Sequence, residues 1–547
     1  MSSHWLDQLL LTPILIPLLA AAALVIINQR RHQLKFSINL ISCLALLANA
    51  VALVYLTDTE HWPRDIGVYL AANWATPFGI ALMADRLAAM MLLLTAIIAL
   101  ASLLYAYARW SRTGVHFHSL FQFLLMGING AFLTGDLFNL FVFFEIMLAA
   151  SYGLVLHGFN AARVRAGMQY IVINLVSSLF FLIGVALIYA AAGTLNMADL
   201  ATQLTGLTPT DRLLLETGAA ILAVAFLTKS AVWPLGFWLP TTYSAASPPV
   251  AALLVLMTKV GVYVLLRLWL LVFADHAGVA SALGANALLA IGVVTIAFGS
   301  IGLLASQELG RMAGYSAIIS SGTLLAAIGY GQPNVISAAL FYLLSSTLAV
   351  AALVMLIELI DRIRKPSAAM LALTMEAFAI GDAPEEADSA GVPIPAAMAF
   401  LGLSFFACAL IIAGLPPLSG FIAKFSLFHA MLNPYGLSAL TADTGNLAAW
   451  LLMALIIVSG LAAIISLMRY GVRTFWATES TPPRLQVTEA GAVGGLLFLC
   501  ILLTVQAGPL RSYLDRVSIG LHYPADYTQR VLSAPTVPGV VNSEGSE

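Results

Sequence analysis

Long apolar stretches separated by short polar loops make up most of this chain of 547 residues. A helix needs about 20 apolar residues to cross a bilayer, so each stretch predicts one membrane-spanning helix. The pattern therefore predicts an all-α polytopic membrane protein with about 14 transmembrane helices. The expected helices cover residues 8–28, 36–56, 79–108, 116–134, 136–157, 165–192, 213–239, 247–273, 284–305, 311–331, 333–360, 396–431, 447–470 and 488–507.

Charged residues in the loops predict the orientation, because Lys and Arg are enriched in short cytoplasmic loops. The basic residues fall in alternate loops, and the opposite loops carry mainly acidic residues. With an even number of helices, both termini are expected outside the cytoplasm. The basic set comprises Arg30, Arg31, Lys35, Arg109, Arg112, Arg163, Arg165, Arg311, Arg362, Arg364, Lys365, Arg469, Arg473 and Arg484, and the acidic set comprises Asp58, Glu60, Asp65, Asp199, Asp211, Asp275 and Asp443.

The seventh and twelfth expected helices contain prolines at corresponding places. The seventh carries FLTKSAVWPLGFWLP, with Lys229 ahead of Pro234, and the twelfth carries AGLPPLSGFIAKFSLF, with Pro416 and Pro417 ahead of Lys424. Proline removes a backbone donor and clashes with the preceding turn, so each helix is expected to break inside the membrane. Paired interruptions in two halves of a chain point to a transport pathway. A kink that serves only helix packing is the alternative.

Helices four to eight and nine to thirteen are therefore expected to form two five-helix repeats. Because five is an odd number, the second repeat enters the membrane from the opposite side, and the repeats are inverted. The last segment ends in a Pro-, Ser- and Gly-rich sequence and is expected to be a mobile hydrophilic tail. The expected divisions are 1–115 for the first three helices, 116–273 for the first repeat, 284–470 for the second repeat with a cytoplasmic loop at 361–395, 471–507 for the last helix and 508–547 for the tail.

Four ionisable residues lie deep inside apolar stretches: Glu145, Lys229, Lys259 and Lys424. A charge at this depth is costly and is usually retained to relay protons or to bind an ion. Burial favours the neutral form of a lysine, and a nearby lysine would keep the Glu145 carboxylate ionised. The four residues are therefore predicted to carry protons, with a fixed salt bridge as the alternative for Glu145. His429, about one turn after Lys424, either extends this route or is an ordinary hydrogen-bonded histidine.

The composition argues against several other classes of function. Hydrophobic residues make up 61% of the chain and charged residues only 9%, which is typical of an integral membrane protein. Cys43, Cys408 and Cys500 are isolated and the histidines lack the spacing of metal ligands, so neither a metal nor a redox cofactor is expected. The sequence has no Gly-rich nucleotide-binding motif. The net charge of -2 provides no basic surface for nucleic acid.

Three segments, TGDLFNLFVFFEIMLAASYGL, FLTKSAVWPLGFWLP and GLPPLSGFIAKFSLF, resemble the antiporter-like subunits of respiratory complex I, membrane-bound hydrogenases and the Mrp multisubunit cation/proton antiporters. The resemblance covers most of the chain, and the GDLFNLFVFFE wording is most similar to the D-type subunits of the Mrp group. It implies a fourteen-helix fold with inverted repeats in a bacterial inner membrane. It also implies functional roles for a glutamate on the fifth helix and lysines on the seventh, eighth and twelfth, which are the positions of Glu145, Lys229, Lys259 and Lys424.

The eleventh expected helix departs from this family pattern. Many relatives carry a histidine and, about five residues later, a lysine, whereas this chain has Ser345 and Val350 at the apparent equivalents. The central proton link is therefore expected either to run through water and the hydroxyl groups of Ser345, Ser346 and Thr347, or to be weaker.

These observations predict a secondary transporter subunit rather than an enzyme. The chain would translocate protons within a hetero-oligomeric antiporter that exchanges cytoplasmic Na+, or another monovalent cation, for external protons. Its partners would be other membrane subunits and the lipid bilayer. One alternative is a proton-pumping subunit of complex I or of a membrane-bound hydrogenase, in which the same residues would do similar work. A self-sufficient transporter is disfavoured, because the chain has no carboxylate cluster suited to a dehydrated Na+.

Overall fold

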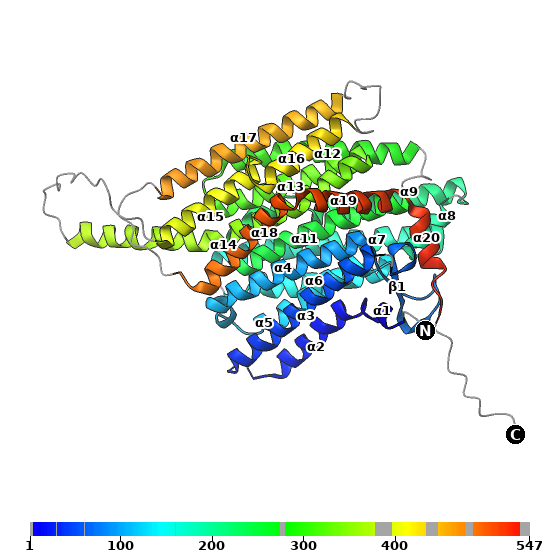
Figure 1. Ribbon diagram of the computed structural model, residues 1–547, viewed down its shortest axis with the longest axis horizontal. Coiled ribbons are helices and arrows are strands. Elements are labelled where there is room, and N and C mark those ends of the chain that lie inside the picture. The colour runs from blue at the N-terminus through cyan, green and yellow to red at the C-terminus, as the bar shows by residue number, and fades with distance from the viewer. Residues whose placement is uncertain are drawn as a thin grey trace.

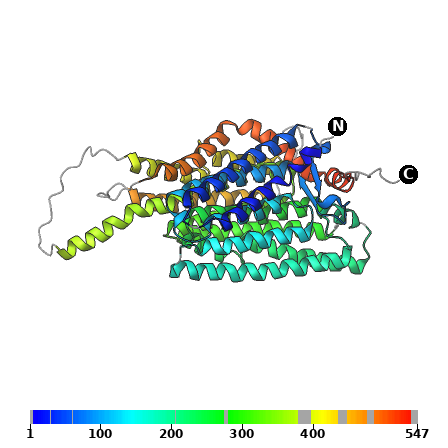
Figure 2. The same cartoon turned by 90° about the horizontal axis from the view of Figure 1, so that it is seen from below.

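A bundle of long helices forms the body of the protein, and most helix axes run in nearly the same direction in both views (Figures 1 and 2). Helix α14 projects beyond one end of the bundle, whereas α1, α8 and α20 lie at the other end (Figure 1). The computed structural model describes residues 4–28, 30–59, 61–158, 160–204, 206–273, 279–377, 396–433, 447–475 and 485–536.

The chain folds almost entirely into helices. In the first half these are α1 (His4–Gln8), α2 (Thr12–Ile26), α3 (His32–Asp58), α4 (Arg86–Ala108), α5 (Phe117–Leu133), α6 (Leu137–Val155), α7 (Ala161–Ala192), α8 (Met197–Gln203), α9 (Pro209–Lys229), α10 (Trp238–Ala245) and α11 (Pro248–Arg267), which continues as the π-helix η4 (Leu268–Val272). In the second half they are α12 (Val279–Ala305), α13 (Leu309–Tyr330), α14 (Pro333–Ala377), α15 (Ala396–Ala413), α16 (Ser419–Leu432), α17 (Leu447–Phe475), α18 (Val487–Val505), α19 (Ala507–His522) and α20 (Pro524–Leu532). Short 3-10 turns lie at Pro63–Asp65, Ala71–Asn73 and Trp110–Arg112.

Eleven of the described helices are long and apolar enough to cross a membrane. Helices α2, α5 and α16 are apolar but shorter. These lengths confirm the predicted class, a helical polytopic membrane protein. Each of the fourteen predicted stretches overlaps one or two of the described helices.

Helices α11 and α14 form the centre of the bundle. Every residue of α11 is buried, from Pro248 to Arg267. Helices such as α7 and α17 instead expose one apolar face. A helix that is apolar on all sides and buried on all sides belongs to the core of a bundle. The lysine at position 259 therefore lies in the middle of the protein.

Both predicted helix breaks are present. The first separates α9 from α10, and the second separates α15 from α16. Glycine allows each break to be tight, because a Cβ atom on Gly236 would collide with the carbonyl oxygen of Ala231, and one on Gly420 with that of Ile411. The prolines account for the missing hydrogen bonds, and the glycines for the close approach of the half-helices.

Three segments differ from the sequence predictions. Residues 81–84, expected at the start of a helix, form strand β2 (Ala81–Ala84), which pairs antiparallel with β1 (Gly67–Leu70). Residues 361–377, expected as a loop, continue α14, and the rest of that loop lies outside the described residues. Residues 508–532, expected as a mobile tail, form most of α19 and all of α20.

The two C-terminal helices are fixed to the end of the bundle that carries the β-hairpin. Arg516 of α19 forms a bidentate pair with Asp58, at 2.8 and 2.9 Å. Arg530 of α20 donates to the carbonyl oxygen of Ile66, at 3.1 Å. On α19 the buried residues Leu514, Val517, Ser518 and Leu521 have helical spacing. An amphipathic face explains why this polar segment is ordered against the bundle.

Candidate functional site

Lys229 is the last residue of α9, at the first helix break, and its side chain is 5% exposed. Its Nζ lies 5.0 Å from the ring centroid of Phe144, the neighbour of Glu145 on α6. Among the described residues, Nζ has no hydrogen-bond partner. An ammonium over an aromatic ring gains some stabilisation, but less than a paired ammonium does. The helix break therefore places this lysine beside α6 without neutralising it.

Glu145 is half-buried, and its Oε1 is buried without a hydrogen-bond partner in the part of the chain that the structure describes. No ion pair within 4.0 Å joins it to Lys229 there, so the expected pair is adjacent but open. Glu145 shares a helical stripe with Phe138 and Val142, which are 51% and 38% exposed. The carboxylate thus lies between the bundle interior and its lateral surface.

Lys259 lies on α11 and is 1% exposed. Its Nζ donates a hydrogen bond to Oγ of Ser320 on α13, at 2.8 Å. The Ser320 oxygen is in turn 2.9 Å from Oγ of Ser346 on α14. A hydroxyl chain therefore leads from this lysine towards the second half of the bundle.

Lys424 lies on α16 and is 6% exposed. Its Nζ donates to the carbonyl oxygens of Ile412, at 3.2 Å, and Ala413, at 2.8 Å. Both carbonyls belong to the last turn of α15, where a helix end leaves acceptors without intrahelical partners. At the same break, Ser419 and Ser345 have their hydroxyl oxygens 2.8 Å apart. The second helix break thus supplies acceptors for the lysine and a contact to α14.

The two remaining candidates lie apart from these contacts. His429 is on the exposed side of α16, whereas Lys424 is buried. The Thr347 hydroxyl donates to the carbonyl oxygen of Leu343 within its own helix. The sequence alone could not separate Thr347 from Ser345, although two residues along a helix point to different faces.

A buried ion pair on the hairpin side was not anticipated from the sequence. Arg267, 2% exposed, donates to Asp85 at 2.8 Å and to the hydroxyl of Tyr263 at 2.9 Å. Lys259, Tyr263 and Arg267 are spaced four residues apart, a pattern that places them on one face of α11 and that the sequence does contain. Tyr527 of α20 approaches the same cluster, and burial raises the pKa of its phenol to about 12.

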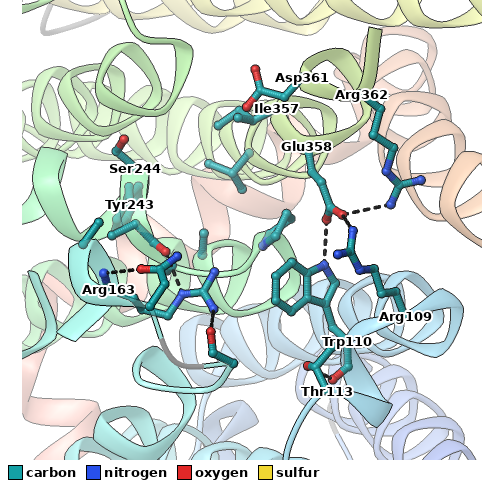
Figure 3. Close-up of a pocket in the computed structure, with 18 residues that line it drawn as sticks. Arg109, Trp110, Thr113, Arg163, Tyr243, Ser244, Ile357, Glu358, Asp361 and Arg362 are labelled. Carbon is teal, nitrogen blue, oxygen red and sulfur yellow. Dashed lines mark hydrogen bonds and ion pairs between the residues drawn. The ribbon is translucent and has the colours of Figure 1, made fainter. Parts of the chain in front are cut away.

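A cavity of about 760 Å³ (Figure 3) opens at the opposite end of the bundle. Glu358 sits on one side of it, accepting from Trp110 at 2.6 Å and pairing with Arg109 at 3.3 Å and Arg362 at 2.9 Å. On the other side of the cavity, Arg163 donates to the carbonyl oxygen of Ala245, at 2.9 Å. These arginines belong to three segments that the sequence pattern predicts on the same side of the membrane, and the structure brings them together.

Similarity to known proteins establishes the family of this chain. The sequence profile of the family "NADH:quinone oxidoreductase/Mrp antiporter, TM" matches residues 134–449. The chain is 54% identical over 536 residues to a probable K(+)/H(+) antiporter subunit of the D type from Rhizobium meliloti, covering 97% of this chain and 99% of the relative. This chain belongs to the NADH:quinone oxidoreductase/Mrp antiporter family. The resemblance to D-type Mrp subunits is thereby confirmed.

Other proteins are similar over nearly the whole of this chain. A Na(+)/H(+) antiporter subunit of the D type from Alkalihalophilus pseudofirmus is 32% identical, over 96% of this chain and all of the relative. A chain of the Mrp complex from Dietzia sp. superposes with a TM-score of 0.79 at 25% identity, covering 96% of this chain and 99% of that one. A chain of an archaeal membrane-bound sulfane sulfur reductase also gives 0.79, at 26% identity, covering 96% and 100%. The fold is thus shared by antiporter and respiratory complexes.

Proposed function

We propose that this chain is the proton-translocating subunit of a multisubunit monovalent cation/proton antiporter. It would act as a secondary transporter driven by the electrochemical gradient, in which one charge crossing 100 mV is worth about 2.3 kcal/mol. Its partners would be the other membrane subunits of an Mrp-type complex in a bacterial inner membrane. The proposal is supported by the names of the relatives and by the state of the buried charges.

One observation carries the proposal. Lys229, Lys259 and Lys424 are each at most 6% exposed, and no salt bridge within 4.0 Å neutralises them or Glu145 in the described residues. A fixed salt bridge would give these buried charges a purely structural role, but none of the four forms one among the described residues. Unneutralised ionisable groups inside a membrane bundle are expected to gain and lose protons. We therefore assign the proton route to these four residues.

The open Glu145 and Lys229 pair suggests how the route is controlled. Closing the pair would stabilise the ammonium of Lys229, and opening it would favour release of a proton towards Lys259. Lys259 would then pass a proton across the bundle centre to Lys424. The lateral position of Glu145 also fits a contact with a partner subunit, because a membrane carboxylate rarely faces lipid.

The fold supports the proposed repeats. The eleven long helices, together with α2, α5 and the α9 and α10 pair, would make fourteen spans. A glycine of the next long helix in the chain packs closely against each helix break. A Cβ on Gly261 of α11 would press on the Ser230 side chain, and one on Gly460 of α17 would press on the Ala413 carbonyl oxygen. This matched packing is expected of two related five-helix units.

The basic loops support the proposed orientation. Arg109, Arg163 and Arg362 line one cavity, so the end of the bundle that holds it would face the cytoplasm. Both termini would then lie outside. Pro248 and Ala251, in the first turn of α11, border the same cavity. The cavity would therefore admit cytoplasmic water to the start of α11.

The transported cation is proposed to be K+ or Na+. The relative with 54% identity is described as a probable K(+)/H(+) antiporter subunit, and that with 32% identity as a Na(+)/H(+) antiporter subunit. The greater identity favours K+. Among the described residues, no cluster of three or more His, Cys, Asp or Glu side chains could hold a metal ion, and we propose that the cation site lies with a partner subunit.

Vesicles that contain the complete complex provide the test. Glu145→Ala should abolish proton exchange driven by K+ or Na+, while Glu216→Ala, which alters an exposed carboxylate on α9, should leave it at the wild-type rate. Exchange retained by the assembled Glu145→Ala complex would refute the assignment.

A pull-down of the tagged chain tests the second candidate function, proton pumping in a respiratory complex. The structural similarity to a chain of the sulfane sulfur reductase supports this candidate. Companions with iron–sulfur motifs would favour that candidate.

A further inference from the structure

The centre of the bundle, between Lys259 and Lys424, is bridged by hydroxyl groups. Ser320 and Ser346 link α13 to α14, with their oxygens 2.9 Å apart. Ser345 and Ser419 link α14 to α16, at 2.8 Å. All four serines are at most 9% exposed. Consecutive residues of α14 therefore face α13 and α16.

The first serine pair can relay a proton away from Lys259. The Lys259 ammonium can only donate, so the Ser320 oxygen accepts its hydrogen bond at 2.8 Å. The Ser320 hydroxyl is then free to donate to Ser346. The Ser346 hydroxyl has only a long contact of 3.3 Å to the carbonyl oxygen of Leu343. The Ser346 hydroxyl can therefore turn towards the small cavity that it lines.

A small cavity is lined by one serine of each pair, Ser346 and Ser345. It measures about 20 Å³. A water molecule needs roughly 10–15 Å³ and two to four polar partners. The polar residues around the cavity are Ser316, Tyr342, Ser345, Ser346 and Ser459. The space and the hydroxyl groups both suit one water molecule.

The cavity also borders the second helix break. Ile412, whose carbonyl oxygen accepts from Lys424, is part of its wall. Gly420, the residue after Ser419, is part of the same wall. A proton leaving the cavity on this side would therefore reach the surroundings of Lys424 directly.

We infer that protons pass from Lys259 to Lys424 through a single water molecule held between the Ser320–Ser346 and Ser345–Ser419 pairs, with no carboxylate, lysine or histidine at the transfer point. This inference rests on the proposed function and specifies its central step. It assigns conducting roles to Ser320, Ser346 and Ser419, which the family pattern does not mark.

Each transfer conserves protons. Lys259 gives one proton to Ser320 as the Ser320 hydroxyl gives its own to Ser346. Ser346, the water molecule, Ser345 and Ser419 each accept one proton and release one in the same way. Lys424 takes up the last proton as a neutral amine, after its side chain turns from the carbonyl oxygens towards Ser419. Each serine ends as a neutral hydroxyl with no excess proton, and the hydroxyl groups must rotate back before the next transfer.

Removing a hydroxyl group is the first test. In vesicles with the complete complex, Ser345→Ala and Ser346→Ala should each lower cation-driven proton exchange by about tenfold or more, equivalent to a barrier raised by roughly 1.4 kcal/mol. The matched control is Thr347→Val. This change removes a hydroxyl from the next residue of α14, but that hydroxyl bonds only within its own helix and does not line the cavity. Thr347→Val should therefore keep the wild-type rate.

Filling the cavity is the second test, because it keeps every serine. Val350 lines the cavity, and Val350→Ile adds a methylene group where the water would lie. Exchange should fall as in the serine variants, whereas Val350→Ala, which leaves room for water, should retain it. If the serines only hold helices together, Val350→Ile would exchange protons at the wild-type rate, and that result would overturn the inference.

The outcome separates the inference from the proposed function. Lys229→Ala, measured in the same vesicles, reports on the proton route as a whole. If Lys229→Ala abolishes exchange while Ser345→Ala, Ser346→Ala and Val350→Ile all retain it, the serine and water bridge is refuted and the route stands. If Lys229→Ala retains exchange, the proposed function itself fails.

Discussion

Replacing Lys259 with methionine separates function from stability. Methionine has a similar length, but it is neutral and apolar. A lysine at the centre of a membrane helix costs about 2.5–3.5 kcal/mol. The hydrogen bond to Ser320, at 2.8 Å, offsets about 1.5–3 kcal/mol of this cost. The Lys259→Met chain should therefore be as stable as the wild type, or more stable by up to about 2 kcal/mol.

Activity should change in the opposite direction. The variant has no proton to exchange at this position, so cation-driven proton exchange should fall by about a hundredfold or more, a barrier increase of roughly 2.7 kcal/mol. The assay is the exchange rate in vesicles, normalised to assembled complex, combined with thermal unfolding of the purified complex. Leu253→Met, a change of similar volume on the same helix, is the control and should alter neither quantity strongly. A less stable Lys259→Met complex with an unchanged exchange rate would show that the lysine is structural.

Three further predictions concern packing and charge. Gly420→Ala places a Cβ atom against the Ile411 carbonyl oxygen and should lower thermal stability by about 1–3 kcal/mol, whereas Gly495→Ala, with open space around it, should not; equal melting temperatures would contradict this. Asp85→Ala leaves Arg267 buried without its partner and should cost about 3–5 kcal/mol in chemical unfolding. Replacing both Asp85 and Arg267 with apolar residues should cost less than Asp85→Ala alone, and a larger loss would show that the pair itself is strongly stabilising.

Much of the fold could be predicted because the bilayer requires long apolar helices. The positions of the breaks followed from Pro234 and from Pro416 and Pro417, since proline cannot complete the hydrogen bonds of a helix. The candidate lysines stood out because a charge inside an apolar stretch needs a reason. These signals are local, and each can be found in a single segment of the sequence.

The C-terminal helices were missed for a different reason. The overall composition of residues 508–547 is polar, which suggested a mobile tail. The segment nevertheless contains an apolar face at Leu514, Val517 and Leu521, and this face packs against the bundle. Spacing of apolar residues, rather than average composition, was the useful signal.

The serine bridges could be predicted only in part. The departure from the family pattern pointed to Ser345, but it could not name its partner Ser419, which is 74 residues away. Ser320 likewise meets Ser346 from another helix. Serines are common in membrane helices. Neither Ser419 nor Ser320 carries a charge or has a spacing that distinguishes it from the other serines. Only the packing of α13, α14 and α16 selects these serines.

The central claim, that buried lysines relay protons in this chain, is tested most directly by one measurement: the rate of cation-driven proton exchange per assembled complex for Lys229→Ala relative to the wild type. The account predicts that the assembled variant exchanges no protons above the background of empty vesicles. A rate equal to that of the wild type, with intact assembly, would contradict it.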